Sequence, residues 1–209
     1  MPRHRWLTVA TALALGLAMA TDALAAAPLD QLKAQIDRVL RTLEDPELRQ
    51  EGKAQERRTA VRNIANDFFD YGETARRSLA RHWAPRTPVE REEFVQLFGD
   101  LLERSYISRI ELYAGEKIAF VGDSVDGDQA VVRTRIITKS GSDVPIDYRM
   151  HRKDDRWLVY DVMVEGISLV SSYRTQFNKI IQSSSFQELV RKLRIKQEEF
   201  LGEERQKRT

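Results

Sequence analysis

Few side chains in this sequence are suited to catalysis, and their spacing matches no catalytic motif. The 209 residues include three histidines (His4, His82 and His151) and no cysteine, which excludes thiol catalysis, disulfide scaffolds and Cys-ligated metal sites. The chain has no H-E-x-x-H, G-x-S-x-G, P-loop or G-x-G-x-x-G motif, and no serine is followed three residues later by lysine. An acid–base enzyme would have to use Asp161, Glu165 and His82, and nothing in their spacing argues that they converge.

The charge balance excludes an electrostatic nucleic-acid binder. Lys and Arg number 34 and Asp and Glu number 32, so the net charge is +2, and the two signs are interspersed along the chain. Hydrophobic residues make up 42% of the chain, which suffices for one domain with a core. We therefore expect a single domain with no nucleic-acid partner, no metal and no cofactor.

The first 25 residues have the pattern of a secretory signal peptide. Arg3 and Arg5 precede a run without charge from Trp6 to Ala20, and an A-x-A pattern ends at Ala25. The run is shorter than the ~20 residues that span a bilayer, and no cysteine follows it to carry a lipid anchor. The sequence predicts cleavage after Ala25, a soluble exported domain over residues 26–202, and a polar tail over residues 203–209.

The elements that would position any functional residues are mostly helical at both ends of the mature chain. Apolar residues recur there at three- and four-residue spacing. The expected helices carry their apolar stripes over residues 29–43, 60–69, 75–83, 94–113, 173–181 and 185–193. The longest opens with the capping box Thr87-Pro88-Val89-Glu90, has an aromatic-rich face, and is expected to end at a cap on Gly115. Another capping box begins at Ser185.

Between the helices, the apolar pattern changes to a period of two. Alternating segments near residues 118–120, 132–136, 144–150 and 157–164 are separated by turn-forming residues at 126–127, 140–142 and 153–155. Short turns between such strands predict an antiparallel meander with one solvent-exposed face, and the preceding helices must cover its other face. The expected fold class is α+β, with an antiparallel sheet of about four strands whose inner face is covered by helices.

Large apolar residues are more numerous than a thin core beneath four strands requires. Two explanations stay open at this point. The aromatic side chains either fill an ordinary core, or they line a cavity between the sheet and the helices that holds an apolar ligand.

Several motifs resemble those of one protein family. They are Asp67-Phe68-Phe69-Asp70-Tyr71, Leu79-Ala80-Arg81-His82-Trp83, Asp147-Tyr148-Arg149 and Trp157-x-Val159-Tyr160-Asp161-x-x-x-Glu165-Gly166-x-Ser168. This set resembles the MlaC family, historically called toluene-tolerance proteins, from about Leu29 to Lys196. One departure is Ala80, where the family often has glycine.

The resemblance implies a periplasmic phospholipid carrier without enzymatic activity. Its fold would be a curved antiparallel β-sheet, NTF2-like in outline, with helices enclosing a deep apolar pocket. The acyl chains would lie in this pocket and the head group near solvent. The implied partners are phospholipid, an outer-membrane lipoprotein–porin complex, and an inner-membrane ABC transporter with its lipid-binding subunit, which together maintain outer-membrane lipid asymmetry. Related hopanoid-associated members share much of the pattern, so a hopanoid or another apolar lipid is an alternative cargo. A small hydrolase or isomerase with Asp161 or His82 as base, and an adaptor without a cavity, are the rival functions.

Strand parity and the helical stripes select candidate lipid-binding residues, each of which is equally compatible with a packed core. The inward strand positions are Val132, Ile136, Ile146, Tyr148, Met150, Leu158, Tyr160 and Val162. The facing helices contribute Phe94, Phe98, Leu101, Tyr106 and Ile110. Trp83 is expected near a wall, and Ile167, Leu169 and Tyr173 near the mouth. Arg81 and Arg174 are candidates for contact with a phosphate, although solvated surface positions would also suit them.

Overall fold

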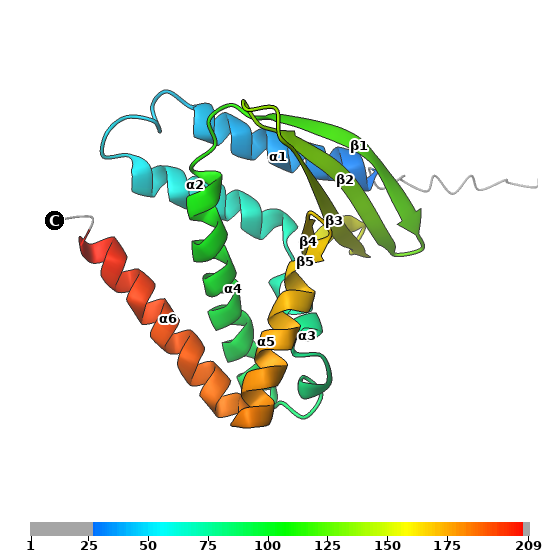
Figure 1. Cartoon of the computed structure of the whole chain (residues 1–209), viewed down its shortest axis with the longest axis vertical. Coiled ribbons are helices and arrows are strands. Elements are labelled where there is room, and N and C mark those ends of the chain that lie inside the picture. Colours follow the sequence, from blue (N-terminus) through cyan, green and yellow to red (C-terminus); the bar gives the residue numbers. More distant parts are fainter. Residues whose placement is uncertain (1–26, 207–209) are drawn as a thin grey trace, which may run out of the picture.

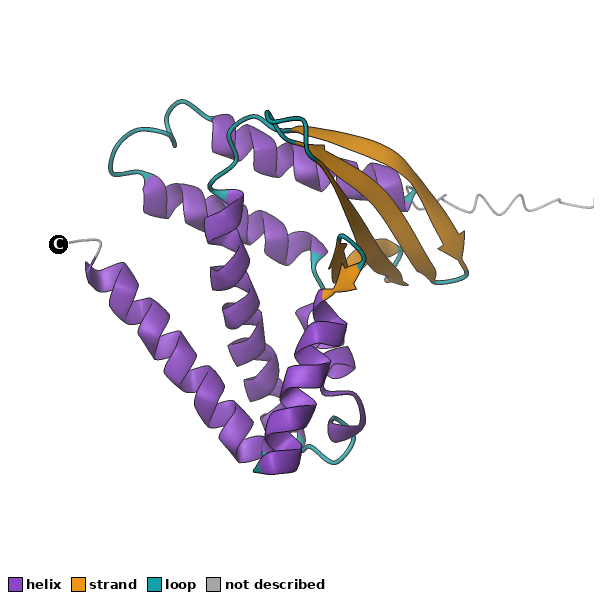
Figure 2. Ribbon diagram, in the orientation of Figure 1, coloured by secondary structure: helices purple, strands orange, loops and turns teal. Residues whose placement is uncertain are grey.

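The computed structural model describes residues 27–206, so the predicted signal peptide lies outside the described residues. Within this range, six α-helices and a 3₁₀ turn accompany one antiparallel sheet (Figures 1 and 2). The elements are α1 (Pro28–Glu44), α2 (Ala54–Phe68), α3 (Tyr71–Leu79), η1 (Ala80–His82), α4 (Pro88–Ile110), β1 (Lys117–Asp126), β2 (Gln129–Ile137), β3 (Asp143–Lys153), β4 (Arg156–Val164), β5 (Ile167–Ser168), α5 (Leu169–Ser183) and α6 (Phe186–Gln206). The expected α+β class is confirmed.

The sheet is a meander whose strands follow one another in chain order, β1-β2-β3-β4-β5. The three predicted turns join the first four strands. The fifth strand is only two residues long and directly precedes α5, and its Ile167 pairs with Val164. Glu165 and Gly166 have φ values of 50° and 80°, a left-handed turn that brings the chain directly back onto β4.

A β-bulge changes which residues of β4 face the helices. Met150 pairs with Val159 but Arg149 pairs with Asp161, so Tyr160 is an extra residue without a partner on β3. A single extra residue exchanges the two faces of a strand. Simple parity therefore fails for Leu158: Val159, opposite Met150, lies in the core instead.

The helix starts are formed by the residues that the sequence indicates. Thr87 accepts a hydrogen bond from the Glu90 N–H at 3.2 Å, and its own N–H donates to the Glu90 carboxylate at 2.9 Å, which completes the capping box. Ser185 accepts from the Glu188 N–H at 3.0 Å. The following helix, α6, continues to Gln206, into the segment predicted as a polar tail.

The C-terminus of α4 differs from the prediction. The helix ends at Ile110, and the N–H groups of Leu112 and Tyr113 then bond three residues back, to Arg109 and Ile110. These tighter turns end the helix before Gly115, so the expected glycine cap does not form. No helix among residues 27–206 is long and apolar enough to cross a bilayer.

Two groups of buried side chains form the core. The helical cluster joins α3, α4, α5 and α6 and consists of Ala75, Leu79, Phe94, Leu97, Phe98, Phe177, Phe186, Leu189, Val190 and Leu193. The sheet cluster joins α1 and α2 to the sheet and consists of Leu32, Ile36, Ile64, Phe68, Ala130, Val132, Met150, Trp157 and Val159. Figure 1 shows the corresponding arrangement, with α1 along the sheet and α4, α5 and α6 extending away from it.

Candidate functional site

A cavity of about 560 Å³ is bordered by both core clusters. Phe98 of the helical cluster and Ile36 and Phe68 of the sheet cluster are among the residues that line it. Its volume lies within the range of about 300–1,000 Å³ that is usual for small-molecule sites. The lining is predominantly aliphatic and aromatic, so the cavity is suited to an apolar ligand.

One wall of the cavity is the sheet. Cross-strand pairing explains which residues reach it, because Ile118 pairs with Ile136, Ile146 with Val164, and Tyr148 with Val162. Residues paired across antiparallel strands point to the same face. The lining side chains from the sheet are therefore consecutive inward positions at one end of its helix-covered face.

The other walls come from helices. The face of α4 contributes Phe98, Leu102, Tyr106 and Ile110 at four-residue spacing, which places them one above another. The first turns of α5 add Leu169, Val170 and Tyr173. The C-terminal half of α1 adds Val39, Leu40 and Leu43.

Ten of the seventeen residues predicted to bind lipid line this one cavity. They are Phe98, Tyr106, Ile110, Ile136, Ile146, Tyr148, Tyr160, Val162, Leu169 and Tyr173. They come from α4, three strands and α5, so the fold brings together positions that the sequence places far apart. Tyr160 remains part of the lining although it is the extra residue of the bulge.

The other seven predicted residues, among them Leu158, lie elsewhere. Val132 and Met150 face inward as expected but are 0% exposed within the sheet cluster, where helices fill the space above them. Phe94 is packed among the rings of Phe98, Phe177 and Phe186. The remaining three are Trp83, Leu101 and Ile167. Trp83 and Leu101 pack against the helical cluster, whereas Ile167 is 64% exposed on β5.

The contribution of the first two helices and of the end of α4 was not predicted from the sequence. The missed lining residues include Ile36, Val39, Leu40, Leu43, Phe68, Phe69, Tyr71, Leu112 and Tyr113. The sequence did indicate a role for α1, because its apolar stripe had to pack against some surface and one face of the sheet needed a cover. Pattern alone does not say over which strands a helix lies.

The buried tyrosines of the lining add no charge to the cavity. Burial raises the pKa of Tyr71, Tyr148 and Tyr173 to about 12. Their phenols are therefore neutral at physiological pH and supply hydroxyl groups without charge. Such a lining favours an apolar ligand over an ionic one.

The candidate acid–base residues do not form a catalytic group. Asp161 borders the cavity but is bonded: it accepts from the Ser168 hydroxyl at 2.6 Å and the Val170 N–H at 3.0 Å, and Arg149 lies 3.6 Å away. These bonds fix the start of α5. His82 and Glu165 are not among the lining residues. Among residues 27–206, no group of three or more His, Cys, Asp or Glu side chains is placed to hold a metal.

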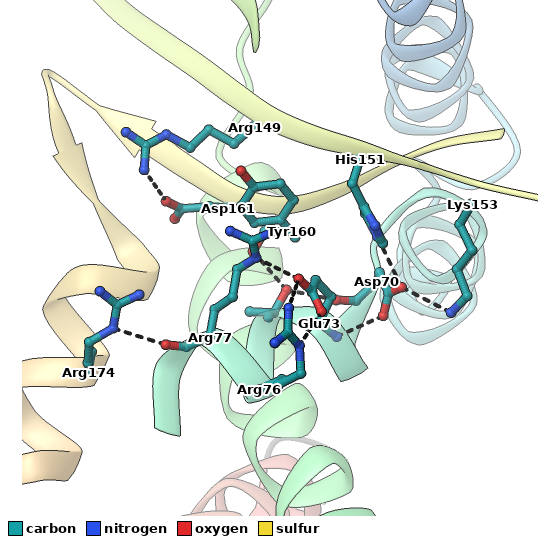
Figure 3. A network of polar contacts seen from close by, with 11 residues as sticks. Asp70, Glu73, Arg76, Arg77, Arg149, His151, Lys153, Tyr160, Asp161 and Arg174 are labelled. Atoms are coloured by element: carbon teal, nitrogen blue, oxygen red, sulfur yellow. Dashed lines mark hydrogen bonds and ion pairs between the residues drawn. The ribbon is translucent and has the colours of Figure 1, made fainter. Parts of the chain in front are cut away.

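A polar network fastens α3 to the sheet (Figure 3). Asp70 caps α3 by accepting from the Glu73 N–H at 2.9 Å, and contacts His151 at 3.2 Å and Lys153 at 3.1 Å. Burial acts to raise the pKa of Asp70, but the Glu73 N–H and the Lys153 ammonium outweigh it and lower that pKa. The carboxylate thus stays charged and holds the chain between α2 and α3 against β3.

The same network continues to α5. Glu73 binds Arg76 at 2.6 Å and Arg77 at 2.7 Å, and the hydrogen bond from Arg76 is the main reason that its pKa is about 2. The Arg77 guanidinium lies 3.9 Å from the Tyr160 ring centre. The backbone carbonyl of Arg77 accepts a hydrogen bond from the Arg174 side chain at 3.0 Å. Arg174 is therefore engaged in the scaffold. Arg81, the other predicted phosphate contact, binds Asn178 at 2.7 Å, and neither lines the cavity.

Comparisons with known proteins agree with this geometry. The family model for MlaC protein matches residues 33–195. The MlaC binding protein of the intermembrane phospholipid transport system of Haemophilus influenzae is 24% identical over 141 residues, which are 65% of this chain and 66% of that protein. A phospholipid-binding protein from Ralstonia solanacearum, solved in complex with a phospholipid, has a TM-score of 0.74 and 26% identity, covering 84% of this chain and 99% of its own.

Proposed function

The chain belongs to the MlaC family, and from this premise we propose that it is a non-enzymatic carrier of phospholipid between two membranes. The observation that carries the proposal is the cavity of about 560 Å³, lined mainly by aliphatic and neutral aromatic side chains. The similar Ralstonia protein was solved with a phospholipid bound, and the Haemophilus relative belongs to an intermembrane phospholipid transport system.

Elementary energetics explain why such a cavity is needed. A two-chain phospholipid has on the order of 28 methylenes, and exposing them to water costs roughly 20 kcal/mol at ~0.8 kcal/mol each. A carrier must offset most of this cost, and it must still release the lipid to an acceptor. A lining with few fixed polar contacts satisfies both demands, because it shelters the chains without binding them to one position.

The place of action that we propose is the periplasm. The predicted signal peptide at residues 1–25 supports export, and the family supports two docking partners: an outer-membrane lipoprotein–porin complex and an inner-membrane ABC transporter with its lipid-binding subunit. In this scheme the protein helps to maintain the lipid asymmetry of the outer membrane. Lipid is exchanged only while the carrier is docked, since an undocked exchange would expose the chains to water.

The acyl chains are proposed to lie against the sheet wall and the α4 face. Ile136, Ile146 and Tyr148 then contact them from the sheet, and Tyr106 and Ile110 from the helix. The rival functions fit less well. The adaptor function requires a filled core, whereas these residues border a cavity. The enzyme function requires a free base, whereas Asp161 is already bonded to Ser168 and Val170.

The decisive measurement is mass spectrometry of organic extracts from protein purified from its native periplasm without detergent. Near-stoichiometric phospholipid is the expected result, and the number of its chains would size the occupied cavity. A hopanoid or other terpenoid in the extract would support the carrier function but with a different lipid as cargo. A folded protein that stays empty even after incubation with phospholipid vesicles would overturn the proposal.

A further inference from the structure

Three charged residues line the cavity: Arg109, Glu116 and Asp161. Two of them already accept hydrogen bonds from other residues of the protein. Asp161 is held by Ser168 and Val170, and Glu116 accepts the Ala114 N–H at 2.8 Å. Arg109 is the one cation of the lining, and no hydrogen bond or ion pair joins its guanidinium to any residue in the described part of the chain.

The position of Arg109 adds a second observation. It lies on the cavity-facing stripe of α4, three residues after Tyr106 and beside Ile110, where the other positions are apolar or aromatic. A basic residue in the last turn of a helix is common, because it faces the negative end of the helix dipole. That preference explains a cation in this turn but not its place on the one face that borders an apolar cavity.

The mouth of the cavity lies at this end of α4. Of all the lining residues, only Arg109, Ile110 and Leu112 are exposed, with Ile110 at 38% and Leu112 at 78%. The opposite end of the cavity is closed by buried side chains such as Phe98 and Thr74. A lipid with its chains inside must therefore place its head group beside the exposed turn.

We propose that the Arg109 guanidinium binds the phosphate of the carried lipid and thereby selects phospholipids over lipids that have the same chains without a phosphate. This inference rests on the proposed carrier function. A guanidinium can donate two parallel hydrogen bonds to a phosphodiester, and such charge-assisted bonds are strong even near solvent. The apolar lining then supplies affinity for chains, and Arg109 distinguishes the head group.

The test compares two lipids that differ only in the head group. Delipidated protein is incubated with mixed vesicles of dioleoyl phosphatidylcholine and dioleoylglycerol, which carry no net charge, and lipid that co-elutes with the protein is quantified by mass spectrometry. We expect the wild type to be enriched in the phospholipid. Arg109→Glu should lower the phospholipid-to-diacylglycerol ratio about tenfold, the order expected for one exposed charge-assisted bond.

Three further variants make the result specific. Arg109→Gln should lower the ratio in the same direction by less, and Arg109→Lys should keep most of it because the charge remains. Arg133→Glu makes the same change of charge at an exposed position between buried Val132 and Thr134, away from the cavity, and should leave the ratio at the wild-type value. An unchanged ratio in Arg109→Glu would overturn the role of Arg109 while leaving the carrier intact. Failure of the wild type to take up either lipid would overturn both proposals.

Discussion

The helix-covered face of the sheet has two ends that look alike in sequence and differ in structure. At one end Val132, Met150 and Val159 are 0% exposed and belong to the buried sheet cluster. At the other end Ile136 and Ile146 border an open cavity. Helix α1 crosses both ends: Leu32 belongs to the packed cluster, whereas Val39, Leu40 and Leu43 line the cavity. The two ends therefore differ in whether the space over the sheet is filled, and not in the type of residue on it.

This contrast separates two properties that are often inferred together. An alternating pattern shows which face of a strand is turned away from water, but it does not show whether that face is filled by neighbours. A strand face that packs against neighbouring side chains contributes to folding stability. A strand face that borders a cavity leaves the same hydrophobic surface available to a ligand. The two ends should consequently respond differently to mutation.

The largest effect on stability is expected at the packed end. Met150→Ala should lower the free energy of unfolding by about 2–5 kcal/mol, because it creates a void among fully buried side chains. Urea denaturation followed by circular dichroism measures the loss. The matched variant Ile136→Ala, whose side chain already borders a cavity, should lose less than about 1.5 kcal/mol, since no new void is enclosed by packed neighbours. Equal losses at the two positions would show that both ends are packed alike.

The cavity end should instead respond in lipid loading. Ile136→Arg and Tyr148→Glu each place a charge in the apolar lining, where burial of an unpaired ion is unfavourable. Both variants should remain folded and bind at least tenfold less phospholipid, a loss of about 1.4 kcal/mol or more. Ile137→Arg is the matched control, because this neighbouring side chain is 37% exposed and does not line the cavity. Wild-type loading by Ile136→Arg would refute the assignment of the sheet wall.

A smaller effect concerns the network that fastens α3 to the sheet. The pKa of Glu73 is about 2 in the folded protein against 4.5 ordinarily, so its ion pairs stabilise the fold fully above pH 4.5. This contribution is lost as the pH falls from about 4.5 through 2, because the unfolded chain binds the proton first. For a partly solvated cluster we expect a total of about 1 kcal/mol. Urea midpoints measured across this pH range should fall less steeply in Glu73→Gln than in wild type, and parallel curves would contradict the role of Glu73.

The sequence was sufficient for the local elements and for the order of the meander, since capping boxes and turn residues act over a few positions. Two features lay beyond such signals. The bulge at Tyr160 depends on pairing with β3, and without it parity turns Leu158 inward instead of Val159. The site of α1 depends on which part of the sheet it covers, so Ile36 and Val39 were missed while Val132 and Met150 were included. Ile167 does not line the cavity, because β5 continues the sheet edge and its side chain is exposed there.

The chain-order meander also has a consequence for the route by which the protein folds. Each of the first three strand junctions closes over a short turn, so the entropy lost on forming each hairpin is small. Contacts between sequence neighbours favour rapid folding. We expect the hairpins to form early, and the final enclosure to wait for α1 and α5, which approach β4 from opposite ends of the chain. Hydrogen-exchange protection should accordingly appear in β2 and β3 before it appears in α1.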